Sequence, residues 1–449
     1  MAERERGSRE VTVELAHPST EPLAQPTPTE PAHPRWWFVN TTPGRILTLG
    51  VVLAMLGILS AFAISTTINE RQHQLTTVLE HTEPLSFAAG QLYTTLSVAD
   101  AAAATAFIAG AEPRAVRQRY EQAITDAAVA ITRASSGLTD PPLVELLGRI
   151  NAQLAVYTGL IETARTNNRM GNPVGSSYLS EASGLMQDTI LPDAQRLYEA
   201  TSAQVDAETT ASASIPAPVI IVVTATLGFG LFVHRWLARR TKRRVNIGLV
   251  IGGLAIGVMI VWVGTALVIS TTGSRSAKNT AADSLRTVTS LAITAQQARA
   301  DETLSLIRRG DEDMRKRSYY QRVDAMRQQL RDYLGRADTV DRTGLAQADQ
   351  LLERWRQADI RINDYISVGN YQAATQVALG TGEDDSTPAF DKLNDALSQG
   401  IQESREQLRS DILSARRVLS GTTVGGAMLS VGAALAVALG LWPRMSEYR

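Results

Sequence analysis

The 449-residue sequence lacks cysteine, has only 5% aromatic residues and carries almost balanced charge, with 44 basic and 45 acidic side chains. The absence of cysteine excludes disulfide bonds, thiolate metal sites and cysteine nucleophiles. The balanced charge gives no indication of a nucleic-acid partner. Because no disulfide bond is available, any domain outside the cytoplasm must be held together by packing alone, which favours regular helix bundles over loop-rich scaffolds.

Histidine is also scarce, with five residues in the chain. His73 and His81 are eight positions apart, outside the spacing of three to four that places two metal ligands together on a helix. The sequence shows no phosphate-binding loop, nucleophile elbow or paired acid–base motif. We therefore expect no catalytic, cofactor-binding or metal-binding residues, and no enzymatic activity.

What the sequence does contain is four long apolar stretches without Asp, Glu, Lys or Arg. Each is long enough to cross a bilayer, which takes about 20 helical residues. They are Ile46 to Ser65, Ile215 to Val233, Ile247 to Ser270 and Gly421 to Trp442. Because 45 residues precede the first stretch, it is interpreted as an uncleaved anchor and not as a signal peptide.

Basic residues predict how these spans are oriented. Residues 235–245 include six basic and no acidic side chains, which places this loop in the cytoplasm together with both termini. The chain is thus expected to be a multi-pass plasma-membrane protein. Its expected parts are a disordered cytoplasmic tail (1–45), a first span (46–66), an extracytoplasmic bundle (67–213), a second span (214–234), a basic loop (235–246), a third span (247–270), a second extracytoplasmic bundle (271–419), a fourth span (420–442) and a cytoplasmic tail (443–449).

The two halves repeat the same plan, which indicates an internal duplication. Ala99-Asp100, Gly110 and Tyr120 match Ala300-Asp301, Gly310 and Tyr320. Both outer segments show apolar residues three and four positions apart, as expected for amphipathic helices. The clearest stripes are Leu143, Leu147, Ile150, Leu154, Tyr157 and Ile161 in the first half, and Val323, Met326, Leu330 and Tyr333, then Leu345, Ala348, Leu352, Trp355, Ile362 and Ile366 in the second.

Three breaks in each outer segment divide it into four helices. The breaks are 110–113, 137–142 and 171–175 in the first half, and 310, 335–344 and 369–388 in the second. The fold class is therefore all-α: four transmembrane helices with two tandem, antiparallel four-helix bundles outside the membrane. The first and third breaks are expected at the membrane-distal tips, and the middle breaks near the membrane.

Charged residues at the expected tips of the second half are candidates for binding a protein partner, since complementary charge speeds and orients association. They are Arg308, Arg309, Arg315, Lys316, Arg317, Glu383, Asp384 and Asp385. A solvated, self-paired charge cluster is the simpler interpretation. Asp359 occupies a core position of a helical stripe, where it either pairs with an arginine or lines a small-molecule site.

The layout of span, bundle and span resembles the sensor domains of bacterial chemoreceptors and histidine kinases, although no cytoplasmic output domain follows here. Three segments, 99–113, 173–179 and 369–374, are similar to the actinobacterial GlnX-type membrane protein. That resemblance implies an extracytoplasmic amino-acid-binding lipoprotein as partner and a cytoplasmic Ser/Thr kinase as output. The function expected is transmembrane signal transduction, and the alternatives are a non-signalling membrane scaffold and an accessory subunit of an amino-acid transporter.

Overall fold

The computed structural model describes residues 42–109, 113–213, 217–241, 265, 281–307, 312–336 and 345–446. The regular elements within these ranges are all helices, so the predicted all-α fold is confirmed. Apart from Thr265, the predicted third span lies outside the described residues. Almost all of the N-terminal tail and most of the basic loop lie outside them as well.

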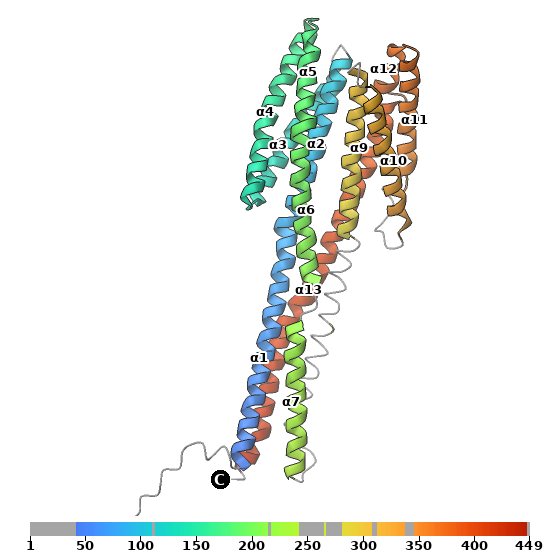
Figure 1. Cartoon of the computed structure of the whole chain (residues 1–449). Helices are drawn as coiled ribbons and strands as arrows, with labels where there is room; N and C mark the ends of the chain where they lie inside the picture. Colours follow the sequence, from blue (N-terminus) through green and yellow to red (C-terminus); the bar gives the residue numbers. More distant parts are fainter. Residues whose placement is uncertain are drawn as a thin grey trace, which may run out of the picture.

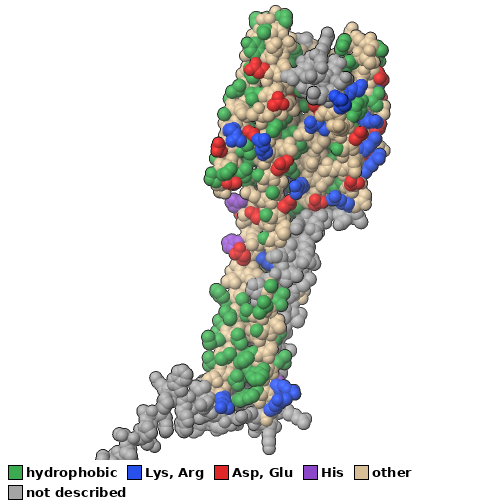
Figure 2. Space-filling model, in the orientation of Figure 1, with side chains coloured by type: hydrophobic (Ala, Val, Ile, Leu, Met, Phe, Trp, Pro, Cys, Tyr) green, Lys and Arg blue, Asp and Glu red, His purple; other side chains and the backbone are tan. Residues whose placement is uncertain are grey.

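Two helices of the described part are long and apolar enough to cross a membrane. The first is the start of one unbroken helical rod made of α1 (Thr42–Thr77), the π-helical turn η2 (Val78–Thr82) and α2 (Glu83–Ile108). The second is α7 (Ala217–Thr241). Their outward surface is apolar, with Phe62 67% and Leu231 70% exposed, and Figure 2 shows this hydrophobic band on the lower part of the molecule. Such a surface is compatible with a membrane protein.

The first bundle consists of α2 and the helices that follow it. They are α3 (Arg114–Gly137), α4 (Pro141–Arg169), α5 (Val174–Leu185), the π-helical turn η3 (Met186–Ile190) and α6 (Leu191–Ala213). Leucine and alanine from α2 and alanine from α3 pack against the predicted α4 stripe, in which Ile150, Tyr157 and Ile161 are at most 1% exposed. Small side chains at the core positions let these helices pack closely.

The second bundle stands beside the first (Figure 1). Its helices are α9 (Asp283–Ile307), α10 (Glu312–Gly335), α11 (Ala348–Ser367), α12 (Tyr371–Leu379) and the start of α13 (Ser386–Ser446). The core contains Trp355, which is fully buried and has ring centroids 5.3 Å from Tyr319 and 5.0 Å from Phe390. Edge-to-face aromatic pairs of this kind add to the stabilisation that burial provides.

One predicted break of the second bundle contains a helix. Residues 369–388 were expected to form a single long break, but α12 occupies its first half. Asn370 accepts a hydrogen bond from the backbone N–H of Ala373 and so caps α12. Gly369, with a φ of 76°, makes the turn between α11 and α12. The glycine-rich segment after α12 masked this short helix in the sequence pattern.

A helical stalk separates the bundles from the apolar part of the rod. The turn between α3 and α4 lies at the base of the first bundle, where Gly137 approaches Leu85. Ser65, the end of the predicted span, is 20 residues before Leu85, or about 30 Å of helix. The middle break of the first bundle was expected near the membrane; it lies about 30 Å of helix beyond the end of the first apolar stretch. Residues of α1, α7 and α13 form the stalk core, among them Ile68, Val219 and Ile412.

Three helices that carry predicted spans have an end at the same end of the molecule. Figure 1 shows the start of α1, the end of α7 and the C-terminal end of α13 together at the lower end of the molecule. Farther along these two helices, Ser60 of α1 and Thr226 of α7 form a hydrogen bond of 2.7 Å between their hydroxyl groups. The part of α13 that carries the predicted fourth span is helical throughout.

Candidate functional site

The predicted acidic and basic candidates do not form one cluster. Arg308 and Arg309 lie outside the described residues, whereas Arg315, Lys316 and Arg317 belong to the first turns of α10. The acidic residues follow α12, whose nine residues place them about 14 Å below the tip. Their partners are local: Glu383 pairs with Lys392 at 3.4 Å, Arg361 donates to the backbone oxygen of Asp384, and Asp385 accepts from the N–H of Gly382 at 2.8 Å.

Asp359 is buried, as predicted, with 4% of its surface exposed. Its carboxylate accepts a hydrogen bond of 2.8 Å from Asn363 and interacts with Tyr320. Of the two roles left open for Asp359, pairing with an arginine is not seen among the hydrogen bonds of the described residues. Burial, followed by the nearby Glu302, raises the pKa of Asp359 to about 7.

The tips instead expose apolar side chains, which the sequence interpretation missed. Met170 beside Gly171 is 68% exposed, and Val368 beside Gly369 is 76% exposed. Both glycines have positive φ, 70° and 76°, so the third turn of each bundle has the same left-handed form. The signal available in the sequence was a large apolar residue next to a turn glycine, where solvation would favour a polar one.

Each bundle also contains a buried polar cluster on its first helix. In the first bundle, Asp100 is 3% exposed. It accepts hydrogen bonds from Gln187 at 2.9 Å, Ser183 at 3.1 Å and Tyr157 at 3.3 Å. The π-helical turn η3 contains Gln187. Burial raises the pKa of Asp100 to about 6, although the three hydrogen bonds oppose this rise.

The matching cluster of the second bundle is centred on Arg299 and Glu302. They form an ion pair of 2.5 Å, and their side chains are 7% and 1% exposed. Trp355 donates to Glu302 at 3.0 Å, and Ser386 donates to the same carboxylate at 2.5 Å. Asp301, which was matched to Asp100, lies instead at the partly exposed surface and pairs with Arg322 at 3.0 Å. The matched residues Asp100 and Asp301 therefore have different surroundings.

Ion pairs join the two bundles across their interface. They are Arg119–Asp391 at 2.7 Å, Arg286–Asp206 at 2.9 Å, Arg405–Glu83 at 2.5 Å and Arg409–Glu83 at 2.8 Å. The first two pairs are largely exposed, and such pairs contribute about 0–1 kcal/mol. Glu83 is only 1% exposed, so its cluster with two arginines dominates this electrostatic contact.

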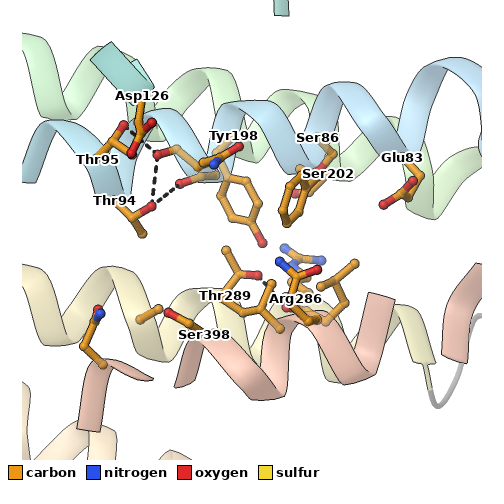
Figure 3. A pocket seen from close by; sticks show the side chains of 18 of the residues that line it. Glu83, Ser86, Thr94, Thr95, Asp126, Tyr198, Ser202, Arg286, Thr289 and Ser398 are labelled. Atoms are coloured by element: carbon orange, nitrogen blue, oxygen red, sulfur yellow. Dashed lines mark hydrogen bonds between the residues drawn. The ribbon is translucent and has the colours of Figure 1, made fainter. Parts of the chain in front are cut away.

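A cavity of about 380 Å³ lies between the bundles. Helices α2, α3 and α6 form one wall, and α9 and α13 form the other. Figure 3 shows Tyr198 pointing from the first bundle towards Thr289 of the second. A Cβ atom at Gly90 would lie 3.4 Å from Thr289 and from Tyr198, so the helices α2, α6 and α9 approach one another closely here. A ligand in this cavity would touch both bundles at once, which makes the interface the candidate functional site.

Comparison with known proteins supports a sensing role for this region. Residues 74–210 match the family described as an actinobacterial sensor domain. This range runs from the stalk to the end of the first bundle. Neither the curated proteins nor the solved structures that were compared with the chain gave a match. The match therefore supports a sensor domain of this kind in the stalk and the first bundle.

Proposed function

We propose that this protein is a transmembrane signal transducer without enzymatic activity of its own. The observation that carries the proposal is helical continuity between the bundle interface and the apolar segments. Glu83 belongs to a rod that is helical from Thr42 to Ile108, and its partner Arg405 belongs to the 61-residue helix α13. A displacement of one bundle against the other is thereby transmitted along both helices towards the membrane.

The membrane arrangement follows from the same helices. We infer four spans, with both termini and the basic loop in the cytoplasm and both bundles outside. Two further features support a tandem duplication: the third turn of each bundle contains a glycine with positive φ, and each first helix carries a buried charged cluster. The two bundles then act as a fused pair whose relative position is the signal.

The extracytoplasmic cue arrives through a protein partner at the tips. An amino-acid-binding lipoprotein is the partner that the family resemblance implies, and a cytoplasmic Ser/Thr kinase is the output. The exposed apolar side chains of Met170 and Val368 support docking of a protein there, since apolar side chains at the centre of a contact contribute most to its affinity. A partner that binds one arrangement of the bundles more tightly shifts the population towards that arrangement.

The experiment measures whether the bundle interface controls the apolar helices. Spin labels are attached to cysteines introduced at Met55 of α1 and Leu231 of α7, both outward-facing positions in a chain that has no other cysteine. Pulsed electron paramagnetic resonance then gives the distance distribution for the full chain in lipid nanodiscs. Asp391→Arg places two arginines opposite each other and is expected to shift the distribution by roughly 1–2 Å.

The charge-swapped variant, Arg119→Asp with Asp391→Arg, restores an attractive pair and is the matched control. It is expected to return the distribution to that of the unmodified interface. A distribution that stays the same in all three proteins, with all three folded, favours a non-signalling scaffold or a transporter subunit, because neither needs a second conformational state.

A further inference from the structure

Most charged groups around the inter-bundle cavity already form ion pairs with one another. Glu83 at one end is neutralised by Arg405 and Arg409. Arg119 donates two hydrogen bonds, of 2.7 and 3.0 Å, to the carboxylate of Asp391. The guanidinium groups that border the cavity are thus already occupied by carboxylates, and the same holds for the pair of Arg286 and Asp206.

Two hydrogen-bond acceptors on the wall of the first bundle have no cationic partner among the described residues. The Oε1 atom of Gln91 on α2 is buried and has no hydrogen-bond partner among the described residues. Asp126 on α3 accepts one hydrogen bond of 2.9 Å, from Gln122 of its own helix, and pairs with no cation in the described part of the chain. Both residues line the cavity. A buried acceptor without a donor costs free energy that a ligand can recover.

These acceptors lie on neighbouring helices. Figure 3 places Asp126 beside Thr95 of α2, and Gln91 is one helical turn away from Thr95. Apart from Asp126 and the ion-paired groups named above, the lining is uncharged, with Thr94 and Ser398 among its hydroxyl groups. Phe87, Val98, Leu285 and Ile401 supply an apolar surface from both bundles. The cavity therefore combines one negative, acceptor-rich wall with an apolar interior.

From this arrangement we propose that the cavity binds a small organic cation, with a primary ammonium group held by Asp126 and Gln91 and a compact apolar group between the bundles. Three N–H donors of an ammonium fit acceptors that receive too few hydrogen bonds. An anion finds no unpaired cation along the cavity wall described here. An α-amino acid would need a cation beside these acceptors for its carboxylate, and Arg119, on the same helix as Asp126, is engaged by Asp391.

This inference deepens the proposed function, because a ligand in contact with both bundles would bias their relative position. Its test measures binding alone and so does not depend on whether a signal is produced. The probes are phenethylammonium and two molecules of similar shape, the neutral 2-phenylethanol and the anionic 3-phenylpropanoate. Isothermal titration calorimetry uses the full chain in phospholipid nanodiscs, with empty nanodiscs as the blank.

The cation is expected to bind at least about tenfold more tightly than the alcohol, and the anion least tightly. Asp126→Asn should weaken the cation about tenfold, whereas Gln91→Glu should strengthen it, because the second change adds negative charge to the same wall. Asp140→Asn, an exposed carboxylate of the same bundle outside the cavity, is the matched control and should leave binding unchanged.

Circular dichroism of each variant confirms that the helical fold is kept. Equal affinities for the three probes, or no detectable binding of the cation at millimolar concentration, would overturn the proposal. An unchanged cation affinity in Asp126→Asn would overturn it as well. If the cation binds but the spin-label distance distribution does not change in Asp391→Arg, this inference stands and the proposed signalling function is rejected.

Discussion

Glu83 of α2 and Arg405 of α13 are 322 positions apart in the sequence, yet they form an ion pair of 2.5 Å. The carboxylate is 1% exposed and accepts a second ion pair, from Arg409 at 2.8 Å. The guanidinium of Arg405 also lies over the ring of Phe87, 3.9 Å from its centroid. This cluster fastens the base of the first bundle to the long helix that leads towards the fourth predicted span.

Replacing Glu83 by glutamine should weaken this attachment strongly. The change leaves Arg405 and Arg409 without their carboxylate; because their side chains are 23% and 40% exposed, the cost should lie below the roughly 3–5 kcal/mol of a fully buried pair. We expect a clear fall in the thermal unfolding midpoint of the detergent-solubilised protein, followed by circular dichroism. Glu80→Gln, three residues earlier and exposed, makes the same charge change and should have little effect. Equal midpoints for the two variants would contradict a dominant role for Glu83.

Asp100 should make the first bundle less stable as pH rises. Burial raises the pKa of its carboxyl group from 3.8 to about 6 in the folded chain. The unfolded chain releases this proton at a lower pH than the folded chain does. The free energy of unfolding should therefore decrease between pH of about 4 and 6 and level off above that range, by roughly 3 kcal/mol from this group.

Asp100→Asn removes the titrating group; its amide oxygen can accept from Gln187 and Ser183, and its NH2 group can donate to the hydroxyl oxygen of Tyr157. Urea unfolding at a series of pH values should show a flatter profile for this variant and a higher stability than the unmodified protein at pH 8. Burial and the nearby Glu302 also raise the pKa of Asp359, so this carboxyl group should add a decrease in the same direction. An identical pH profile for Asp100→Asn and the unmodified chain would show that Asp100 is not responsible.

Much of the helical fold could be predicted from the sequence, because apolar periodicity reports which face of a helix is buried. Tyr157 and Trp355, each taken from a predicted stripe, are both fully buried. The predicted breaks at 137–142 and 171–175 also coincide with helix ends at Gly137 and Arg169. Glycine and proline at these points interrupt the apolar pattern, so a few neighbouring residues are enough to predict where each helix ends.

The inter-bundle contacts could not be predicted, because they depend on pairs that are far apart in the chain. Arg119 and Asp391 are 272 positions apart, and each looks like an ordinary surface residue of its own helix. The matched dipeptides of the two halves show the same limit of sequence identity. Asp301 shares a dipeptide with Asp100, but Asp301 lies nearer the surface and pairs with Arg322, which identity alone does not predict.

Polar substitutions at the two tip turns should weaken capture of the extracytoplasmic partner. The double variant Met170→Ser with Val368→Ser removes two exposed apolar side chains without disturbing a core. We expect about a tenfold loss of the binding lipoprotein in affinity capture followed by mass spectrometry. Val156→Ser, 57% exposed on the side of α4, is the matched control. Equal recovery of the lipoprotein with both proteins would place its binding site away from the tips.

A disulfide between positions 90 and 289 should lock the bundles together. A Cβ atom at Gly90 would lie 3.4 Å from the Thr289 Cγ2 atom, so its separation from the Thr289 Cβ falls close to the 3.5–4.5 Å that a disulfide needs. The double variant Gly90→Cys with Thr289→Cys offers only this pair, since the chain has no cysteine of its own. We expect oxidation to link the two bundles intramolecularly.

The link is detected by cleaving the chain between the bundles, at a protease site inserted in the basic loop, and comparing gels with and without reductant. The fragments should stay joined until the disulfide is reduced. Gly90→Cys with Ser305→Cys, which pairs a position at the interface with one in the upper turns of α9, is the control and should release two fragments under both conditions. Release of fragments from the 90–289 variant after oxidation would mean that α2 and α9 do not stay side by side in the membrane-bound protein.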